Sequence, residues 1–417
     1  MNLYSRNDSY ELYQGNMLDM LEVIELNTID SVITDPPYEL NFMSKGWDNA
    51  GVSFQKETWQ KCYEVLKPGG YLLAFGGSRT FHRIACAIED AGFEIRDTIM
   101  WLYGSGFPKS LNISKTLEKR EGIIEETTGT LFNNSGGKRD LSKRSDYGYV
   151  YEPQIEIAKQ WQGWGTALKP SFEPIIVARK PFKGSLVDNV IKNGVGGINI
   201  DECRVEPTGE DIGRNNINTK NSPLNSKDGW NNNSMVGLDT TGRYEGRFPA
   251  NTILTYDEND FDEVCGEFPK DNKEKSNARY FYCAKASKKD RDEGLEESEL
   301  KTDCDRNEEC YSANVPFNRS SLPKKNIHPT VKPTSLMQYL VRLVTPNGGT
   351  ILDPFNGSGS TGKAVMYENK ERNKNYKYIG IELTEEYLPI AKARIEYVCK
   401  LTEEEKVKER QMSIYDI

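Results

Sequence analysis

Histidine is scarce in this sequence, and its cysteines never form a Cys-x-x-Cys pair. Only His82 and His328 occur among 417 residues, and the eight cysteines are scattered. Structural zinc sites need closely spaced cysteine and histidine ligands, so this set excludes the usual ones. We expect free, reduced cysteines and no bound metal.

Long apolar runs are absent as well. No stretch approaches the ~18 apolar residues of a membrane-spanning helix, and residues 1–15 lack the apolar segment of a signal peptide. Hydrophobic residues make up 36% of the chain, below the usual ~45–50%. We therefore expect a soluble, cytoplasmic protein with no membrane contact, in which long polar insertions surround an ordinary core.

Positive charge is also in deficit, with a formal net charge of −9. A negative total would ordinarily argue against a nucleic-acid partner. Residues 257–310, however, carry 18 acidic and 10 basic side chains, so this stretch alone accounts for −8. The rest of the chain is nearly neutral and free to present a basic groove. We interpret the acidic stretch as a solvated face.

Strand and helix signals alternate in two parts of the chain. Apolar runs predict strands at 30–34, 71–75, 94–103, 174–178, 350–353 and 378–382, and helical spacing predicts helices at 58–66, 79–89, 333–345, 360–367 and 385–399. Nearly continuous apolar strands between helices are typical of a mostly parallel sheet covered on both faces. Residues 185–325 are instead rich in Asn, Ser, Gly and Asp, which predicts an inserted, loop-rich module.

The segment from Asp353 to Thr361, sequence DPFNGSGST, lies between a predicted strand and a predicted helix. Its glycines allow a ligand to approach the backbone closely. A P-loop fits through Lys363, but Ala364 lacks the hydroxyl that holds magnesium. A dinucleotide fingerprint fits only partly. A site for S-adenosylmethionine fits too, with acids at two successive strand ends, Asp353 and Glu382, for the amino group and the ribose hydroxyls.

The quartet Asp35-Pro36-Pro37-Tyr38 also follows a predicted strand. An exocyclic amine on a nucleobase is a poor nucleophile because its lone pair is delocalised into the ring. A carboxylate and a backbone carbonyl that both accept from that amine would favour an attacking geometry. Prolines fix the backbone, and an aromatic ring can stack on a base removed from the duplex. A tyrosine packed after a Pro-Pro turn is the purely structural alternative.

Together, TDPPY at 34–38 and LDPFNGSGSTG at 352–362 resemble the two signature motifs of the amino-group DNA methyltransferases, which modify N6 of adenine or N4 of cytosine. The catalytic motif precedes the cofactor motif, an order typical of the β class, including phage and mobile-element members. HPTVKP at 328–333 resembles the helix before the cofactor loop, and EPIIVARKP at 173–181 is similar to other family members. This family implies a Rossmann-like methyltransferase fold.

The resemblance implies a role for each matching residue. The catalytic set is Asp35, Pro36, Pro37 and Tyr38, and the cofactor set is Asp353, Pro354, Phe355, Asn356, Gly357, Ser358, Gly359, Ser360, Thr361, Glu382, Thr330, Lys332 and Asn16. Asn16 is a departure, because the family often has aspartate there. S-adenosylmethionine is the implied cofactor and double-stranded DNA the implied partner, in a bacterial or phage-infected cell. The sequence leaves a homodimer and a restriction endonuclease partner open.

The resulting division assigns 1–111 and 326–417 to the catalytic and cofactor-binding parts of one methyltransferase domain, with 165–184 as one of its strands. Residues 112–164 form a surface insertion, and 185–325 form the target-recognition module. The expected reaction is direct transfer of a methyl group to N6 of a flipped adenine. N4 of cytosine is the alternative within the family, and a P-loop-like nucleotide-binding protein is the alternative outside it. C5 methylation of cytosine is excluded, because no Pro-Cys dipeptide supplies its nucleophile.

Overall fold

The computed structural model describes residues 2–39, 51–103, 110–123, 151–205, 248–255, 281–283, 285–300 and 324–401. The chain divides into two compact units. The first comprises Met1–Gly104, Phe172–Gly294 and Thr330–Ile417, and the second comprises Ser105–Ser171 and Leu295–Pro329.

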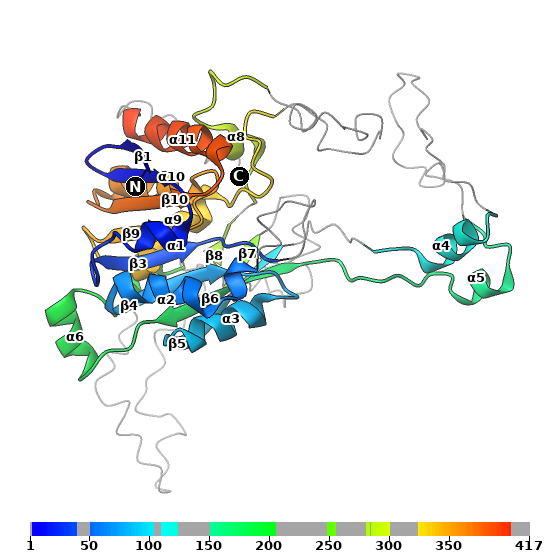
Figure 1. Ribbon diagram of the computed structural model, residues 1–417, viewed down its shortest axis with the longest axis horizontal. Helices are drawn as coiled ribbons and strands as arrows, with labels where there is room; N and C mark the ends of the chain where they lie inside the picture. The colour runs from blue at the N-terminus through cyan, green and yellow to red at the C-terminus, as the bar shows by residue number, and fades with distance from the viewer. Residues whose placement is uncertain are drawn as a thin grey trace, which may run out of the picture. The chain divides into compact units, whose positions relative to one another are not determined.

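The first unit is built on one ten-stranded sheet with the order β1-β2-β10-β9-β3-β4-β6-β5-β7-β8. Its strands are β1 (Asn2–Arg6), β2 (Tyr10–Gln14), β3 (Ile29–Thr34), β4 (Leu66–Phe75), β5 (Glu94–Tyr103), β6 (Phe172–Arg179), β7 (Thr252–Thr255), β8 (Phe281–Tyr282), β9 (Thr350–Asp353) and β10 (Lys377–Glu382). Figure 1 shows the C-terminal strands β10 and β9 between the blue N-terminal strands β1 and β3.

Most neighbouring strands run parallel. From β2 through β10, β9 and β3 to β4 every pair is parallel, and β6 runs antiparallel to both β4 and β5. The predicted fold class, a mostly parallel, Rossmann-like sheet flanked by helices, is thereby confirmed. The carboxyl ends of β3, β9 and β10 meet at one edge, which is where open α/β sheets bind their ligands.

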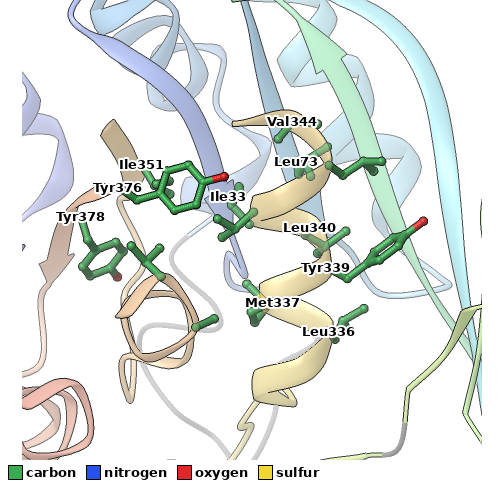
Figure 2. Close-up of a cluster of buried hydrophobic side chains, with 14 of the residues drawn as sticks. Ile33, Leu73, Leu336, Met337, Tyr339, Leu340, Val344, Ile351, Tyr376 and Tyr378 are labelled. Atoms are coloured by element: carbon green, nitrogen blue, oxygen red, sulfur yellow. The ribbon is translucent and has the colours of Figure 1, made fainter. Parts of the chain in front are cut away.

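Two groups of helices cover the two faces of the sheet. One group is α1 (Met17–Leu21), α2 (Lys56–Val65) and α3 (Phe81–Asp90); the other is α9 (Thr334–Val344), α10 (Ser360–Arg372) and α11 (Leu388–Lys400). Alternate strand residues serve the two faces: Val32 and Leu72 pack with the first group, Ile33 and Leu73 with the second. Figure 2 shows the buried side of α9 against the second set. None of the described helices is long and apolar enough to cross a membrane.

The predicted elements recur with small boundary shifts. The helix predicted at 333–345 begins at Thr334, after Pro333, so HPTVKP at 328–333 is not helical. The helix predicted at 385–399 begins as a 3-10 turn, Glu385–Tyr387, before α11. The helix predicted at 360–367 continues to Arg372.

The described residues of 185–294, a range predicted to lie in the inserted module, belong to the first unit. They supply α6 (Leu186–Asn193), a 3-10 turn (Asp201–Cys203), the strands β7 and β8, and α8 (Lys288–Asp292). The strands β7 and β8 are only four and two residues long, and β8 falls within ARYFYC at 278–283, for which a strand is the expected structure. The remaining parts of the module, 206–247, 256–280 and 301–323, lie outside the described residues, as do 124–150 of the predicted surface insertion.

The described part of the second unit contains two short helices, α4 (Ile113–Arg120) and α5 (Glu156–Gln160). The buried carboxylate of Glu118 on α4 accepts hydrogen bonds from the Tyr151 hydroxyl at 3.0 Å and the backbone N–H of Ile155 at 3.1 Å. These bonds lower the pKa of Glu118, although desolvation acts in the opposite direction. Ser114 on α4 donates to the Ala158 carbonyl at 2.7 Å, so α4 and α5 are joined by buried polar contacts.

Candidate functional site

The two sequence motifs meet at the ends of neighbouring strands. β3 pairs with β9 in parallel, with Val32 opposite Leu352. Thr34, the last residue of β3, donates its hydroxyl hydrogen to Asp353 Oδ1 at 2.7 Å. The catalytic quartet begins at the next residue, Asp35, so the two motifs are in direct contact although more than 300 residues separate them in sequence.

Asp353 is only 2% exposed, and its carboxylate is heavily hydrogen-bonded. Oδ1 accepts from the Thr34 hydroxyl and from the Phe355 N–H at 3.1 Å, and Oδ2 accepts from the Thr361 hydroxyl at 2.6 Å. A carboxylate offers about four acceptor positions, so about one remains, on Oδ2. Burial raises the pKa of Asp353 to about 6, although the hydrogen bonds favour the ionised form.

The loop after Asp353 turns on glycines. Gly357 and Gly359 have φ of +52° and +75°, a region that side chains disfavour. A Cβ on Gly359 would lie 3.0 Å from Ala391 on α11, so this glycine also allows α10 to begin close to α11. Asn356 is fixed beneath the loop, because its Oδ1 accepts from the Tyr378 hydroxyl at 2.7 Å. The loop is therefore preformed.

A buried arginine on α11 holds the serines of this loop. Arg394 donates to the carbonyl of Ser358 at 2.8 Å, to its hydroxyl at 3.1 Å and to the Ser360 hydroxyl at 3.2 Å. The other loop residues are also largely buried: Pro354 and Thr361 are buried, and Phe355 is half-buried against the α1–α3 side of the sheet. Arg394 was not among the residues predicted from sequence.

Glu382 ends β10 beside the same loop. Its Oε2 accepts from the Gly357 N–H at 2.7 Å, its Oε1 accepts from the Thr384 N–H at 2.7 Å, and its carbonyl accepts from the Gly15 N–H at 3.0 Å. Burial raises the pKa of Glu382 to about 7. Asn16, the next residue after Gly15, caps α1 by accepting from the Leu18 N–H at 3.0 Å.

One carboxylate oxygen of Asp35, in the catalytic quartet, accepts no hydrogen bond from the described residues. Oδ2 of Asp35 pairs with the ammonium group of Lys332. Oδ1 of Asp35 is buried, and no hydrogen-bond partner reaches it in the part of the chain that the structure describes. Leaving a buried carboxylate oxygen unsatisfied is costly, and such groups are uncommon away from functional positions.

Tyr38 lies beside this carboxylate. Its hydroxyl donates to Glu173 Oε2 at 3.0 Å, and its carbonyl accepts from the Thr80 hydroxyl at 2.8 Å. Burial and the neighbouring carboxylates of Asp35 and Glu173 raise the pKa of Tyr38 well above its usual value, so the hydroxyl stays protonated. The Pro37 carbonyl accepts from Ser53 at 2.6 Å.

Two of the predicted cofactor residues lie elsewhere in the site. The amine of Lys332 contacts Asp35, the Tyr38 hydroxyl at 3.2 Å and Glu173 at 3.4 Å, which places it within the catalytic quartet. Thr330 is exposed in the segment before α9. Glu173, at the start of β6, was not predicted, although it opens the EPIIVARKP stretch that resembled the family.

The P-loop alternative depended on Lys363, and the structure removes that support. Its side chain is 1% exposed, and its ammonium group pairs with Glu293 at 2.6 Å and Asp290 at 2.8 Å. These partners also correct the interpretation of the acidic stretch 257–310 as a solvated face. At Asp290 and Glu293 the acids are packed against α10, while 256–280 and 301–323 lie outside the described residues.

Asp290 on α8 joins three buried groups, which leads to a stability prediction. Its carboxylate accepts from the Thr334 N–H at 3.0 Å and from Lys363, and its carbonyl accepts from Arg394 at 3.1 Å. Replacing it with alanine leaves the Thr334 N–H without its acceptor and Lys363 with Glu293 as its remaining carboxylate, so Asp290→Ala is expected to lower the free energy of unfolding by about 3 kcal/mol. Urea denaturation measures this, with Asp90→Ala, at the exposed end of α3, as control. Equal unfolding of the two variants would contradict it.

A mostly parallel α/β sheet with a glycine-rich loop and an unsatisfied carboxylate at adjacent strand ends defines a class of ligand-binding enzyme folds. Comparison with known proteins identifies the family: the N6/N4 methyltransferase profile, described as DNA methylase, matches residues 29–393. The chain belongs to this family of DNA methyltransferases.

Curated relatives are similar over parts of the chain. It is 24% identical over 230 residues to the type II methyltransferase M.HindIII of Haemophilus influenzae, covering 45% of this chain and 64% of that protein. It is 40% identical over 232 residues to the type II methyltransferase M2.LlaDCHI of Lactococcus lactis subsp. cremoris, covering 47% of this chain and 81% of that protein. Among solved structures, the cytosine-N4-specific PvuII DNA methyltransferase matches with 14% identity, a TM-score of 0.42, and 98% and 94% of the two chains covered.

Proposed function

We propose that this protein transfers a methyl group from S-adenosylmethionine to the exocyclic N6 of adenine in double-stranded DNA. The observation that carries the proposal is the unpartnered Oδ1 of Asp35, buried at the end of β3. An amino group brought to this oxygen would supply the missing donor. The neighbouring cofactor loop, one strand away, would place a methyl donor within reach of that amine.

The residues at the end of β9 and β10 fit the cofactor. S-adenosylmethionine supplies a sulfonium methyl group, an electrophile that needs no covalent enzyme intermediate. Asp353 Oδ2 retains an acceptor position for the amino group of its methionine part, and Glu382 retains acceptor capacity for the ribose hydroxyls. The φ values of Gly357 and Gly359 bring backbone to the ligand without side chains in between.

Asp35 prepares the nucleophile by accepting from the target amine. The Pro37 carbonyl already accepts from Ser53, which favours the Pro36 carbonyl as the second acceptor. Two acceptors on one amino group orient its lone pair towards the methyl group, and positioning of this kind is the main requirement for direct transfer. Tyr38 offers an aromatic ring on which an extruded base can stack.

Adenine is favoured over cytosine because the quartet begins with aspartate. The family resemblance implies serine more often at this position in cytosine-N4 enzymes. Methylating unmodified duplex DNA with the purified chain, then digesting it to nucleosides for mass spectrometry, distinguishes the products. N6-methyladenine is expected. N4-methylcytosine alone would overturn the choice of base, and no methylated base would overturn the function.

We also propose that the polar segments within 185–325, together with 112–164, read the DNA sequence. Residues 186–193, 252–255 and 281–294 build the first unit, so the role would fall to the segments between them and to the second unit. Base recognition needs only a few side chains that reach the groove edges, and loop-rich insertions carry such residues without disturbing a sheet.

The raised pKa values of the two cofactor acids lead to a binding prediction. With a pKa of about 6 for Asp353 and about 7 for Glu382, the ligand-free site holds about one proton at pH 6.5. S-adenosylmethionine carries net positive charge and favours ionised acids, so binding near pH 6.5 is expected to release up to about one proton. Near pH 8.5 both acids are already ionised, so release there is expected to fall nearly to zero.

Calorimetry in two buffers of different ionisation enthalpy measures this release. Affinity is expected to rise as the pH increases through 6 and 7. The same two acids lower the free energy of unfolding of the ligand-free protein as the pH rises through 6 and 7. The folded state binds more protons than the unfolded state over this range, and it loses them as the pH rises. Glu382→Gln should reduce the release at pH 6.5. Equal binding enthalpies in both buffers at that pH would contradict the assignment.

A further inference from the structure

Lys332 is buried among carboxylates and aromatic rings at the catalytic quartet. Its side chain is 8% exposed. The ammonium group contacts Asp35 Oδ2, lies 3.4 Å from Glu173 Oε2, and sits 4.8 Å from the centre of the Phe75 ring. Burial lowers the pKa of Lys332, but the carboxylates of Asp35 and Glu173 outweigh it and raise the pKa overall, so the amine is charged.

This arrangement divides the two oxygens of Asp35 between two tasks. Lys332 occupies Oδ2, and Oδ1 has no hydrogen-bond partner among the residues that the structure describes. Glu173 in turn contacts Lys332 and accepts from the Tyr38 hydroxyl, so it fixes both the lysine and the aromatic ring. The side chains of Asp35 and Glu173 are only 20% and 21% exposed, so little water screens the three charges.

We propose that Lys332 and Glu173 are positioning residues for methyl transfer: Lys332 holds Oδ2 of Asp35 so that Oδ1 is left for the target amine, and Glu173 holds Lys332 in place. The inference rests on the proposed function. It assigns Lys332 to the acceptor side of the reaction, whereas the sequence resemblance placed it with the cofactor. Neither residue touches the reacting atoms, and both act through Asp35 and Tyr38.

The other charged or titratable groups around Asp35 and Glu173 come from three elements. Asp353 ends β9, Tyr103 ends β5 and hydrogen-bonds with Glu173, and Lys285 follows β8 with its ammonium group 3.5 Å from the Tyr103 ring centre. Burial lowers the pKa of Lys285. The position of Lys332 against Asp35 makes it the cation that separates the two carboxylates. Without it, Asp35 and Glu173 would share a buried site as like charges, which favours protonation of one of them.

The test is the pH dependence of single-turnover transfer of labelled methyl from S-adenosylmethionine to duplex DNA. Lys332→Met is expected to slow transfer at pH 7 by about 10- to 100-fold. It should also move the acid limb of the profile to higher pH by about one unit or more. The double variant Lys332→Met/Glu173→Gln should return the limb towards that of the wild type, because only one carboxylate remains. Lys332→Arg, which keeps the charge, should also retain the wild-type limb.

Lys67→Met is the matched control, since Lys67 pairs with Asp30 at 2.6 Å near the opposite end of β3. It should leave the pH profile unchanged. Affinity for S-adenosylmethionine, measured by calorimetry, should stay within about threefold of wild type in Lys332→Met, because the lysine does not act through the cofactor. If Lys332→Met does not fold, Lys332→Arg and the double variant carry the test, because the first keeps the cation and the second leaves one buried carboxylate in place of two.

An unshifted acid limb in Lys332→Met would overturn the proposal, as would a large loss of cofactor affinity with a normal transfer rate in that variant. If the double variant had the same acid limb as Lys332→Met, Glu173 would have no part in the proposed positioning. A wild-type chain that transfers no methyl group to any DNA base would instead refute the proposed function, so the two failures are distinguishable.

Discussion

Asp35→Ala is expected to lower the single-turnover rate of methyl transfer by about 10²–10⁴-fold and to leave DNA affinity almost unchanged. The carboxylate is the group that would accept from the target amine, and its Oδ1 has no described partner to satisfy it otherwise. DNA affinity depends mainly on phosphate contacts, which this buried side chain at a strand end does not make. The change therefore separates chemistry from binding.

Asp35→Asn tests the same claim with less disturbance. The amide keeps the size of the side chain, and its oxygen can still accept from Lys332, so the fold should survive. Its nitrogen carries donors in place of a free acceptor, which opposes an approaching amine. Transfer is expected to fall almost as far as in the alanine variant. Asp8→Ala, at an exposed position between β1 and β2, is the control. Near-normal transfer to adenine by Asp35→Asn would refute the activating role.

Strands β3 and β9 were predictable because each is a short buried run that ends at aspartate and proline, and β5 because its second half, TIMWLY, is apolar. The boundaries of β5 and β9 agree with the prediction, and β3 begins one residue earlier. Burial on both faces of a parallel sheet makes such runs nearly continuous, which is a strong signal. The two motifs were visible for the same reason, since each follows a strand end. Their contact through Thr34 and Asp353 joins residues 319 positions apart, which no local pattern specifies.

The charged network around the site had no local signature at all. Lys363 resembled a phosphate-binding lysine in sequence, yet its partners are Asp290 and Glu293, about 70 residues earlier. Glu173 and Lys332 likewise meet from distant segments. A charged side chain in a polar stretch is usually solvated, so composition predicts exposure unless a buried counter-ion is known. That partner is a property of the tertiary structure.

Asp353 gives the other large expected effect, on cofactor binding. Asp353→Asn should weaken S-adenosylmethionine binding by about 10- to 150-fold, because a charge-assisted hydrogen bond of about 1.5–3 kcal/mol is lost. Asparagine preserves the local structure, since its oxygen can accept from Thr34 and from the Phe355 N–H. The Thr361 hydroxyl can rotate to accept from the new amide. Asp353→Ala would instead leave two buried threonine hydroxyls without their acceptor.

Thr34→Val is the matched control for this variant. It removes the hydrogen bond between β3 and Asp353 without changing charge. If the carboxylate acts by its charge towards the cofactor amino group, Thr34→Val should reduce affinity by less than about 10-fold, because Asp353 keeps its charge and its bonds from the Phe355 N–H and the Thr361 hydroxyl. Both variants are measured by titration calorimetry at pH 8, because the other cofactor acid, Glu382, is ionised at that pH. If Asp353→Asn binds as tightly as wild type there, the amino group is held by another residue, because no charge at Asp353 would then be needed to bind a cation.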